Sequence, residues 1–273
     1  MMKTAWHELP REVQDTVNRE LGGVADIEMI SEGLSSDLTF AAETGSGRLF
    51  VKGARLDDDL KTRQLRREIS INPYVTHLSP KIRLHVEEAG WLIIGFDHIE
   101  GRRADYSPLS PDIALVLDLL DRLSETPCPE IPLREGGRLR ANHVRPEDVH
   151  RFSGDTLVHS DLNPGNVWIT GDGHAYLLDW ARYMRGAPWS DATAFAMCLM
   201  TCGHTPYDAE RILSALSVWK TLGPGDLDAV AYYQSTVRST WKPRLDPWTN
   251  ASVAAARRWH DYRTALEPEA GHR

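Results

Sequence analysis

The run HSDLNPGN, residues 159–166, constrains this chain more than any other part of its sequence. Apolar segments flank the run, and the Pro-Gly pair in its middle favours a tight turn. A second apolar segment, LLDW at residues 177–180, places Asp179 thirteen residues after Asn166. The Asp-Gly pair at 172–173 predicts a hairpin between 167–169 and 176–178. We therefore expect Asp161, Asn166 and Asp179 to lie at the ends of neighbouring strands.

These three side chains offer two carboxylates and one amide oxygen. Oxygen ligands of this kind suit Mg²⁺, which is typically held by one or two carboxylates together with substrate phosphates. The alternative is a hydrated loop in which the Asp and Asn residues only cap turns. Because the run, its turn and the second Asp occur together, the sequence favours the metal site.

The rest of the chain divides into a part rich in strands and a part rich in helices. Before residue 101 the patterns predict helices over 9–21 and 58–75 and strands over 26–31, 37–43, 48–53, 81–87 and 91–96. After it they predict a helix over 110–123, an irregular stretch over 126–144 and helices within 190–266. We expect an α+β fold with a small sheet-rich lobe, 1–100, and a larger helical lobe, 101–273.

The motifs at 159–166 and 177–180 resemble those of the aminoglycoside phosphotransferase and choline kinase family, which has a two-lobed protein-kinase-like fold. That family shows H-G-D-x-x-x-x-N, followed by an apolar strand that ends in D-W or D-F. The resemblance implies that Asp161 accepts the proton of the attacking hydroxyl or orients it. It also implies that Asn166 and Asp179 hold Mg²⁺ on the phosphates of ATP or GTP.

The resemblance extends upstream to residues that would bind the nucleotide. Lys52 ends an apolar strand and would grip the phosphates, held by Glu68 sixteen residues later. No G-x-G-x-x-G loop is present, and the turn at 32–37 offers Ser35 and Ser36 instead. Main-chain groups near Asp97 and Ile99 would bind the purine, with Phe96 lining its pocket.

Three positions in the later motif bear on the same comparison. Ser160 stands where the family usually has Gly, and Arg182 where an acidic residue is common. Asp191 matches an Asp that caps a helix or ties down the catalytic loop. None of these departures removes a residue that the resemblance marks as catalytic.

The acceptor is the least constrained part of the prediction. Residues 102–273 hold 22 acidic and 19 basic residues, which is a nearly balanced set and weakens the case for a polycationic aminoglycoside. Aromatic residues are frequent there, and they suit stacking on flat rings or sugars. The best pocket candidates flank prolines in an expected loop and are Trp241, Arg244, Asp246 and Trp248.

Composition excludes several other classes of protein. The formal net charge of −8 disfavours binding to nucleic acid, and no apolar run is long enough to span a membrane. We expect a cytoplasmic phosphotransferase that acts on an antibiotic or a related natural product, for resistance or self-protection. A metabolic kinase for choline, an amino alcohol or a sugar is the first alternative, and a catalytically inactive kinase-like binding module is the second.

Overall fold

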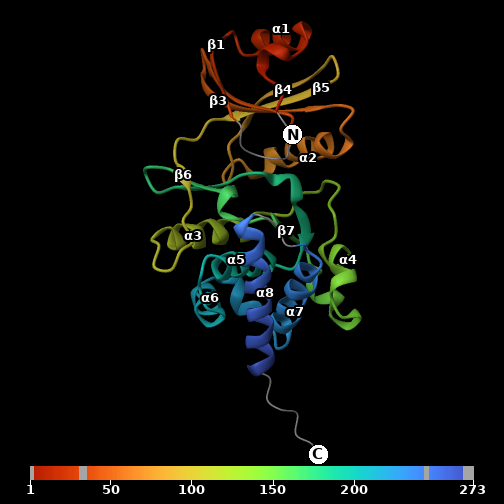
Figure 1. The fold of residues 1–273 in the computed structure, drawn as a ribbon, viewed down its shortest axis with the longest axis vertical. Helices are drawn as coiled ribbons and strands as arrows, with labels where there is room; N and C mark the ends of the chain where they lie inside the picture. Colours follow the sequence, from red (N-terminus) through yellow and green to blue (C-terminus); the bar gives the residue numbers. More distant parts are fainter. Residues whose placement is uncertain (1–2, 31–35, 243–245, 267–273) are drawn as a thin grey trace, which may run out of the picture. The chain divides into compact units, whose positions relative to one another are not determined.

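A computed structural model describes residues 3–30, 36–242 and 246–266 of the 273-residue chain (Figure 1). The chain forms two compact units. The first unit contains Met1–Gly101 together with the short segment Leu178–Arg182. The second contains Arg102–Leu177 and Tyr183–Arg273. The segment that carries Asp179 therefore belongs to the same unit as Lys52 and Glu68.

The first unit is built on a five-stranded antiparallel sheet of order β1-β2-β3-β5-β4. Its strands are β1 (Val24–Met29), β2 (Leu38–Thr44), β3 (Gly47–Arg55), β4 (Ile82–Glu88) and β5 (Trp91–Asp97). β2 and β3 form a hairpin whose glycine-containing turn lies between Thr44 and Gly47.

Both faces of this sheet are covered, which explains why β5 is apolar without alternation. Trp91 and Ile93 of β5 belong to the cluster under α1 (Arg11–Glu20), together with Val13 and Val17 of that helix. Leu92, Ile94 and Phe96 face the cluster that contains Leu65 of α2 (Asp59–Val75). Figure 1 shows the two helices on opposite sides of the sheet. A strand that is buried on both faces needs apolar side chains at successive positions.

The second unit combines short strands with a helical body. Two small sheets are formed by β6 (Arg102–Arg103), β8 (Val167–Ile169) and β9 (Ala175–Leu177), and by β7 (Thr156–Val158) and β10 (Met184–Gly186). The helices are α3 (Asp112–Ser124), α4 (Gly136–Arg140), α5 (Ser190–Thr201), α6 (Pro206–Leu213), α7 (Asp226–Ser239) and α8 (Pro247–Leu266). The predicted α+β fold class is confirmed.

Local differences from the predicted elements are small. The stretch 126–144, expected to be irregular, contains the single-turn helix α4. α2 contains Pro73 and continues past it to Val75, which agrees with the predicted helix over 58–75. Pro73 lies in the last turn of α2, so few helical hydrogen bonds remain to be formed after it. Among the described residues, no helix is long and apolar enough to cross a bilayer.

Candidate functional site

The loop that contains Asp161 is fastened at its start by Asp191, in the first turn of α5. The two carboxylate oxygens of Asp191 accept hydrogen bonds of 2.8 Å from the main-chain N–H groups of His159 and Ser160. Burial raises the pKa of Asp191, and His159 and these two N–H groups act in the opposite direction. Of the two roles predicted for Asp191, the structure thus shows the one of tying down the loop.

The backbone of the loop is strained at Ser160. Its φ of +72° lies in the left-handed region, which costs a residue with a side chain about 1–2 kcal/mol relative to the right-handed region. This explains why glycine is usual at this position in the family that the sequence resembles. After Ser160, the N–H of Asp161 donates 3.2 Å to Nδ1 of His159.

Two asparagines organise the loop around Asp161. Nδ2 of Asn163 donates to Oδ1 of Asp161 over 2.8 Å, while its Oδ1 accepts from the N–H of Gly165 over 2.9 Å. Nδ2 of Asn166 donates 3.0 Å to the main-chain oxygen of Asp161. That bond fixes the orientation of the Asn166 amide and leaves its Oδ1 without a partner in the part of the chain that the structure describes. The sequence analysis gave no role to Asn163, although Asn two residues after Asp is a common turn signal.

The ion pair predicted between Lys52 and Glu68 is present in the first unit. Nζ of Lys52 lies 3.1 and 3.0 Å from the two carboxylate oxygens of Glu68, and the side chains are only 12% and 4% exposed. Burial alone would lower the pKa of Lys52, but Glu68 and Asp179 outweigh it and the pKa is raised. The pKa of Glu68 is raised to about 7 in total. Burial is the largest cause and Asp179 also raises the pKa, while Lys52 lowers it.

Asp179 presents its carboxylate beside this pair. Its φ of +59° is left-handed, and within the described ranges its side chain makes no hydrogen bond. The turn that follows, Trp180–Arg182, is held to α2 by a 2.7 Å bond from Nε of Arg67 to the carbonyl of Ala181. The carboxylate of Asp179 in the first unit and the amide oxygen of Asn166 in the second are each of the kind that a hard cation such as Mg²⁺ prefers. No cluster of three or more His, Cys, Asp or Glu residues suited to a metal occurs among the residues described.

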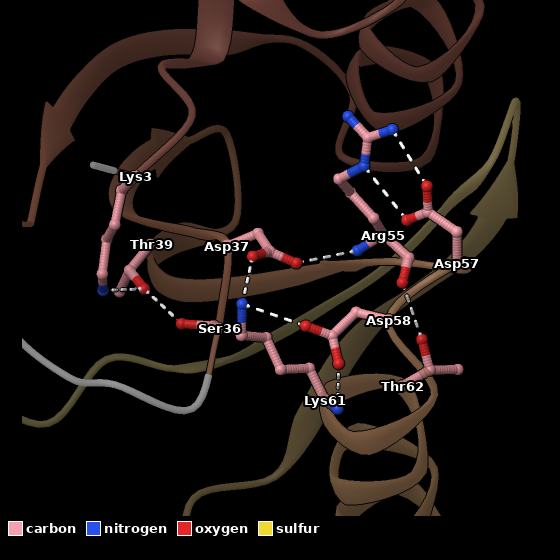
Figure 2. Close-up of polar contacts among 9 residues, drawn as sticks. All are labelled: Lys3, Ser36, Asp37, Thr39, Arg55, Asp57, Asp58, Lys61 and Thr62. Carbon is pink, nitrogen blue, oxygen red and sulfur yellow. Dashed lines mark hydrogen bonds and ion pairs between the residues drawn. The ribbon is translucent and has the colours of Figure 1, made fainter. Parts of the chain in front are cut away.

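The residues expected around the nucleotide fall into two groups. Ser35 lies outside the described residues, and the buried Ser36 hydroxyl is engaged at 2.7 Å with Oγ1 of Thr39 (Figure 2). Both carboxylate oxygens of Asp97 accept from Nε of Arg83 over 2.8 and 3.0 Å. These two side chains are therefore occupied within the protein.

The other two residues of the expected nucleotide site are a buried phenylalanine and a residue with unpartnered main-chain groups. Phe96 is 6% exposed, and Nζ of Lys52 lies 5.6 Å from the centre of its ring. The main-chain N–H and C=O of Ile99 make no hydrogen bond within the described part of the chain. Such unpartnered main-chain groups are what recognition of a purine edge requires.

Figure 2 shows a polar network that the sequence analysis missed. Asp37 accepts from Nζ of Lys61 and, over 3.1 Å, from the N–H of Arg55, while its own N–H donates 2.9 Å to the carbonyl of Gly53. Lys61 also contacts Asp58, at 3.2 Å. The network joins the first turn of α2 to the end of the strand that carries Lys52. Nothing in the sequence marks Asp37 or Lys61, since single charged residues of this kind are mostly exposed.

The four acceptor candidates have different environments. Trp241 is 41% exposed and its ring lies 4.9 Å from the guanidinium carbon of Arg238. Asp246 caps α8, because it accepts from the N–H groups of Trp248 and Thr249 over 3.2 and 3.0 Å. Arg244 lies outside the described residues. The structure thus gives Asp246 a capping role, and it adds Arg238, which the sequence analysis did not single out.

Comparisons with known proteins bear on this arrangement. The sequence model of the phosphotransferase enzyme family matches residues 150–233, which include Asp161, Asn166 and Asp179. The resemblance predicted from the motifs is therefore confirmed. No curated protein matches the chain.

Solved structures show the same fold over nearly the whole chain. Choline kinase LicA from Streptococcus pneumoniae is 14% identical, with a TM-score of 0.60, over 92% of this chain and 99% of that one. Macrolide 2′-phosphotransferase MphH from Brachybacterium faecium is 14% identical, with a TM-score of 0.59, over 95% and 99%. A thermostable mutant of aminoglycoside phosphotransferase APH(4)-Ia, solved with ADP and hygromycin B, is 14% identical, with a TM-score of 0.59, over 95% of this chain and 99% of that one. The protein-kinase-like fold is confirmed.

Proposed function

We propose that this protein is a Mg²⁺-dependent O-phosphotransferase. It moves the γ-phosphoryl group of ATP or GTP to a hydroxyl of an antibiotic or a related natural product. The observation that carries the proposal is the buried Lys52–Glu68 pair next to the unpartnered carboxylate of Asp179. Burying two charges costs desolvation energy, so a buried ion pair is weak evidence of a stabilising role. A functional role explains better why the pair is buried. A lysine that is held in place and a nearby Mg²⁺ ligand together suit a triphosphate.

The first unit supplies most of the nucleotide contacts in this proposal. Lys52 binds the phosphates and Glu68 positions it. Phe96 and the main-chain groups of Ile99 hold the base, whereas the side chains of Ser36 and Asp97 serve the local structure. The complexes of LicA with AMP and of APH(4)-Ia with ADP support a nucleotide as the donor.

The second unit supplies the base and one oxygen for the metal. Asp161 orients the acceptor hydroxyl and takes up its proton, and its own position is set by Asn163 and by the loop anchored at Asp191. Asn166 and Asp179 hold Mg²⁺, which neutralises the phosphate charge when it is bound. The inactive binding module is disfavoured, because each of the catalytic positions that the family resemblance marks is occupied by the expected residue.

The test compares Asp161→Asn with the wild-type chain. We expect nucleotide-dependent phosphorylation of a panel of antibiotics, amino alcohols and sugars to fall by about 10²–10⁴-fold, the usual size of a general-base contribution. Nucleotide affinity, followed with a fluorescent analogue, should change little. Asp261→Asn is the matched control, because Asp261 is exposed on α8 and outside the site. Near-normal turnover in a folded Asp161→Asn variant would show that Asp161 does not act as the base for the acceptor hydroxyl.

A further inference from the structure

Arg238 lies within the helical body of the second unit, near the end of α7 (Asp226–Ser239). Its Nε donates 2.7 Å to the hydroxyl of Ser252 on α8, and one terminal nitrogen donates to Oε1 of Gln234. Both partners are neutral and buried, at 3% and 7% exposure. An arginine carries five N–H donors, so three of them have no partner in the part of the chain described.

Within the described ranges, no carboxylate pairs with this guanidinium, unlike comparable arginines. Burial lowers its pKa, and the groups that oppose this are the Cys198 thiol and the Tyr233 phenol. Burial raises the pKa of Cys198 above its ordinary value of 9.0, so this thiol is no counter-ion at neutral pH. The other arginines with a shifted pKa have it raised by a carboxylate partner, and they are Arg55, Arg83, Arg102, Arg151 and Arg263.

Arg238 and Asp161 of the catalytic loop both lie within electrostatic reach of one group, the Cys198 thiol of α5. Arg238 lowers and Asp161 raises the pKa of that thiol. The packing agrees, because Tyr106 donates 3.2 Å to the carbonyl of Leu162, and its ring lies 4.9 Å from that of Phe195. Phe195 and Cys198 are three residues apart on α5 and so lie on one face of that helix.

Trp241 completes the environment of Arg238. Its ring lies 4.9 Å from the guanidinium carbon, and the residue is 41% exposed. Stacking fixes the plane of the guanidinium, and three of its N–H donors have no partner among the described residues. A carboxylate matches this geometry, because two of its oxygens can accept from two parallel N–H donors.

From these contacts we propose that Arg238 binds a carboxylate of the acceptor, so that the substrate is a hydroxyl compound with an acid group rather than a polycation. The inference rests on the proposed phosphotransferase activity and specifies its acceptor. A single guanidinium also matches the single charge of a carboxylate. The competing explanation is structural: Arg238 would only connect α7 to α8 through Ser252.

The experiment uses matched pairs of acceptors. Homoserine, mandelate and 4-hydroxyphenylacetate are each assayed beside their primary amides, with an aminoglycoside and choline as cationic members of the panel. Mg²⁺ and nucleotide are kept saturating. We expect phosphorylation among the acids, with kcat/KM at least about 30-fold higher for an acid than for its amide.

Variants then separate binding from structure. Arg238→Met should raise the KM of the acid and bring acid and amide to similar kcat/KM, while Arg238→Lys should restore part of the preference because it keeps the charge. Arg257→Met is the matched control, because Arg257 is exposed on the neighbouring helix α8. A purely structural Arg238 would instead lower the melting temperature without changing the ratio between acid and amide.

The outcomes distinguish this inference from the proposed function. Phosphorylation confined to amides, choline or the aminoglycoside overturns the carboxylate site and leaves the phosphotransferase activity standing. An acid preference that survives in Arg238→Met also overturns it. Absence of phosphoryl transfer to every member, together with absence of Mg²⁺-dependent nucleotide binding, counts against the proposed function itself.

Discussion

At the scale of single residues, the protonation of Glu68 affects the stability of the folded chain. Burial raises its pKa to about 7 from the ordinary value of 4.5. The folded chain therefore holds this proton more tightly than the unfolded chain does. The contribution of Glu68 to stability is fully present below pH 4.5 and is lost as the pH rises through about 7.

Glu68→Gln should remove this dependence on pH. The difference between the two pKa values corresponds to roughly 3 kcal/mol. We expect the free energy of unfolding of the wild-type chain, relative to Glu68→Gln, to fall by about that amount between pH 5 and pH 8. Urea unfolding at the two pH values measures it, and taking the difference between the variants cancels the titration of other groups. A difference that is the same at both pH values would show that Glu68 is not the titrating group.

At the scale of elements, the network around Asp37 connects two parts of the nucleotide site (Figure 2). Lys61 and Glu68 lie on α2, while Gly53 and Arg55 end the strand that contains Lys52. Asp37 joins the two elements through its bonds to Lys61, Arg55 and Gly53. The network thus helps to fix the position of Glu68 relative to Lys52.

Asp37→Ala should weaken this connection. We expect the KM for nucleotide to rise about 3–10-fold with a smaller change in kcat, and stability to fall by about 1–3 kcal/mol, because Lys61 loses a partly buried partner. Asp57→Asn is the matched control: Asp57 pairs with the side chain of Arg55 nearby, but it is 71% exposed. Steady-state kinetics and thermal unfolding measure both effects. Equal behaviour of the two variants would rule out the positioning role.

The elements and the site differ in how much of them the sequence predicts. Strands and helices of the first unit were predicted within a few residues, because apolar periodicity and turn residues are local signals. The run at 159–166 was found because its spacing is distinctive, and the Lys52–Glu68 pair was predicted because the family that the run resembles pairs a strand Lys with a helical Glu. Arg238 and Asp37 gave no such signal: an isolated Arg or Asp is exposed in most proteins, and only packing between elements shows that these two are not. For Ser36, the sequence does not reveal that Thr39 engages its hydroxyl.

At the scale of the whole molecule, charge bears on the choice of acceptor. The chain has a formal net charge of −8, whereas residues 102–273 are nearly balanced. A polycation would be drawn to such a protein at long range, and that attraction weakens as salt is added. An acid would be repelled at long range and attracted only at Arg238. Added salt weakens the long-range repulsion strongly, which raises the affinity for an acid. It weakens the partly buried contact with Arg238 less, which lowers that affinity, so the two effects oppose each other.

Affinity for the true acceptor should therefore depend only weakly on ionic strength. The Debye length falls from about 10 Å at 0.1 M to about 3 Å at 1 M salt, which removes most attraction between exposed charges. Stacking of Trp241 on Arg238 resists this change, because apolar burial does not weaken in salt. We expect the acceptor KM to change by less than about tenfold over this range, measured with nucleotide saturating at every salt concentration. A larger loss of affinity would point to attraction by exposed carboxylates and so to an aminoglycoside-like polycation as the substrate.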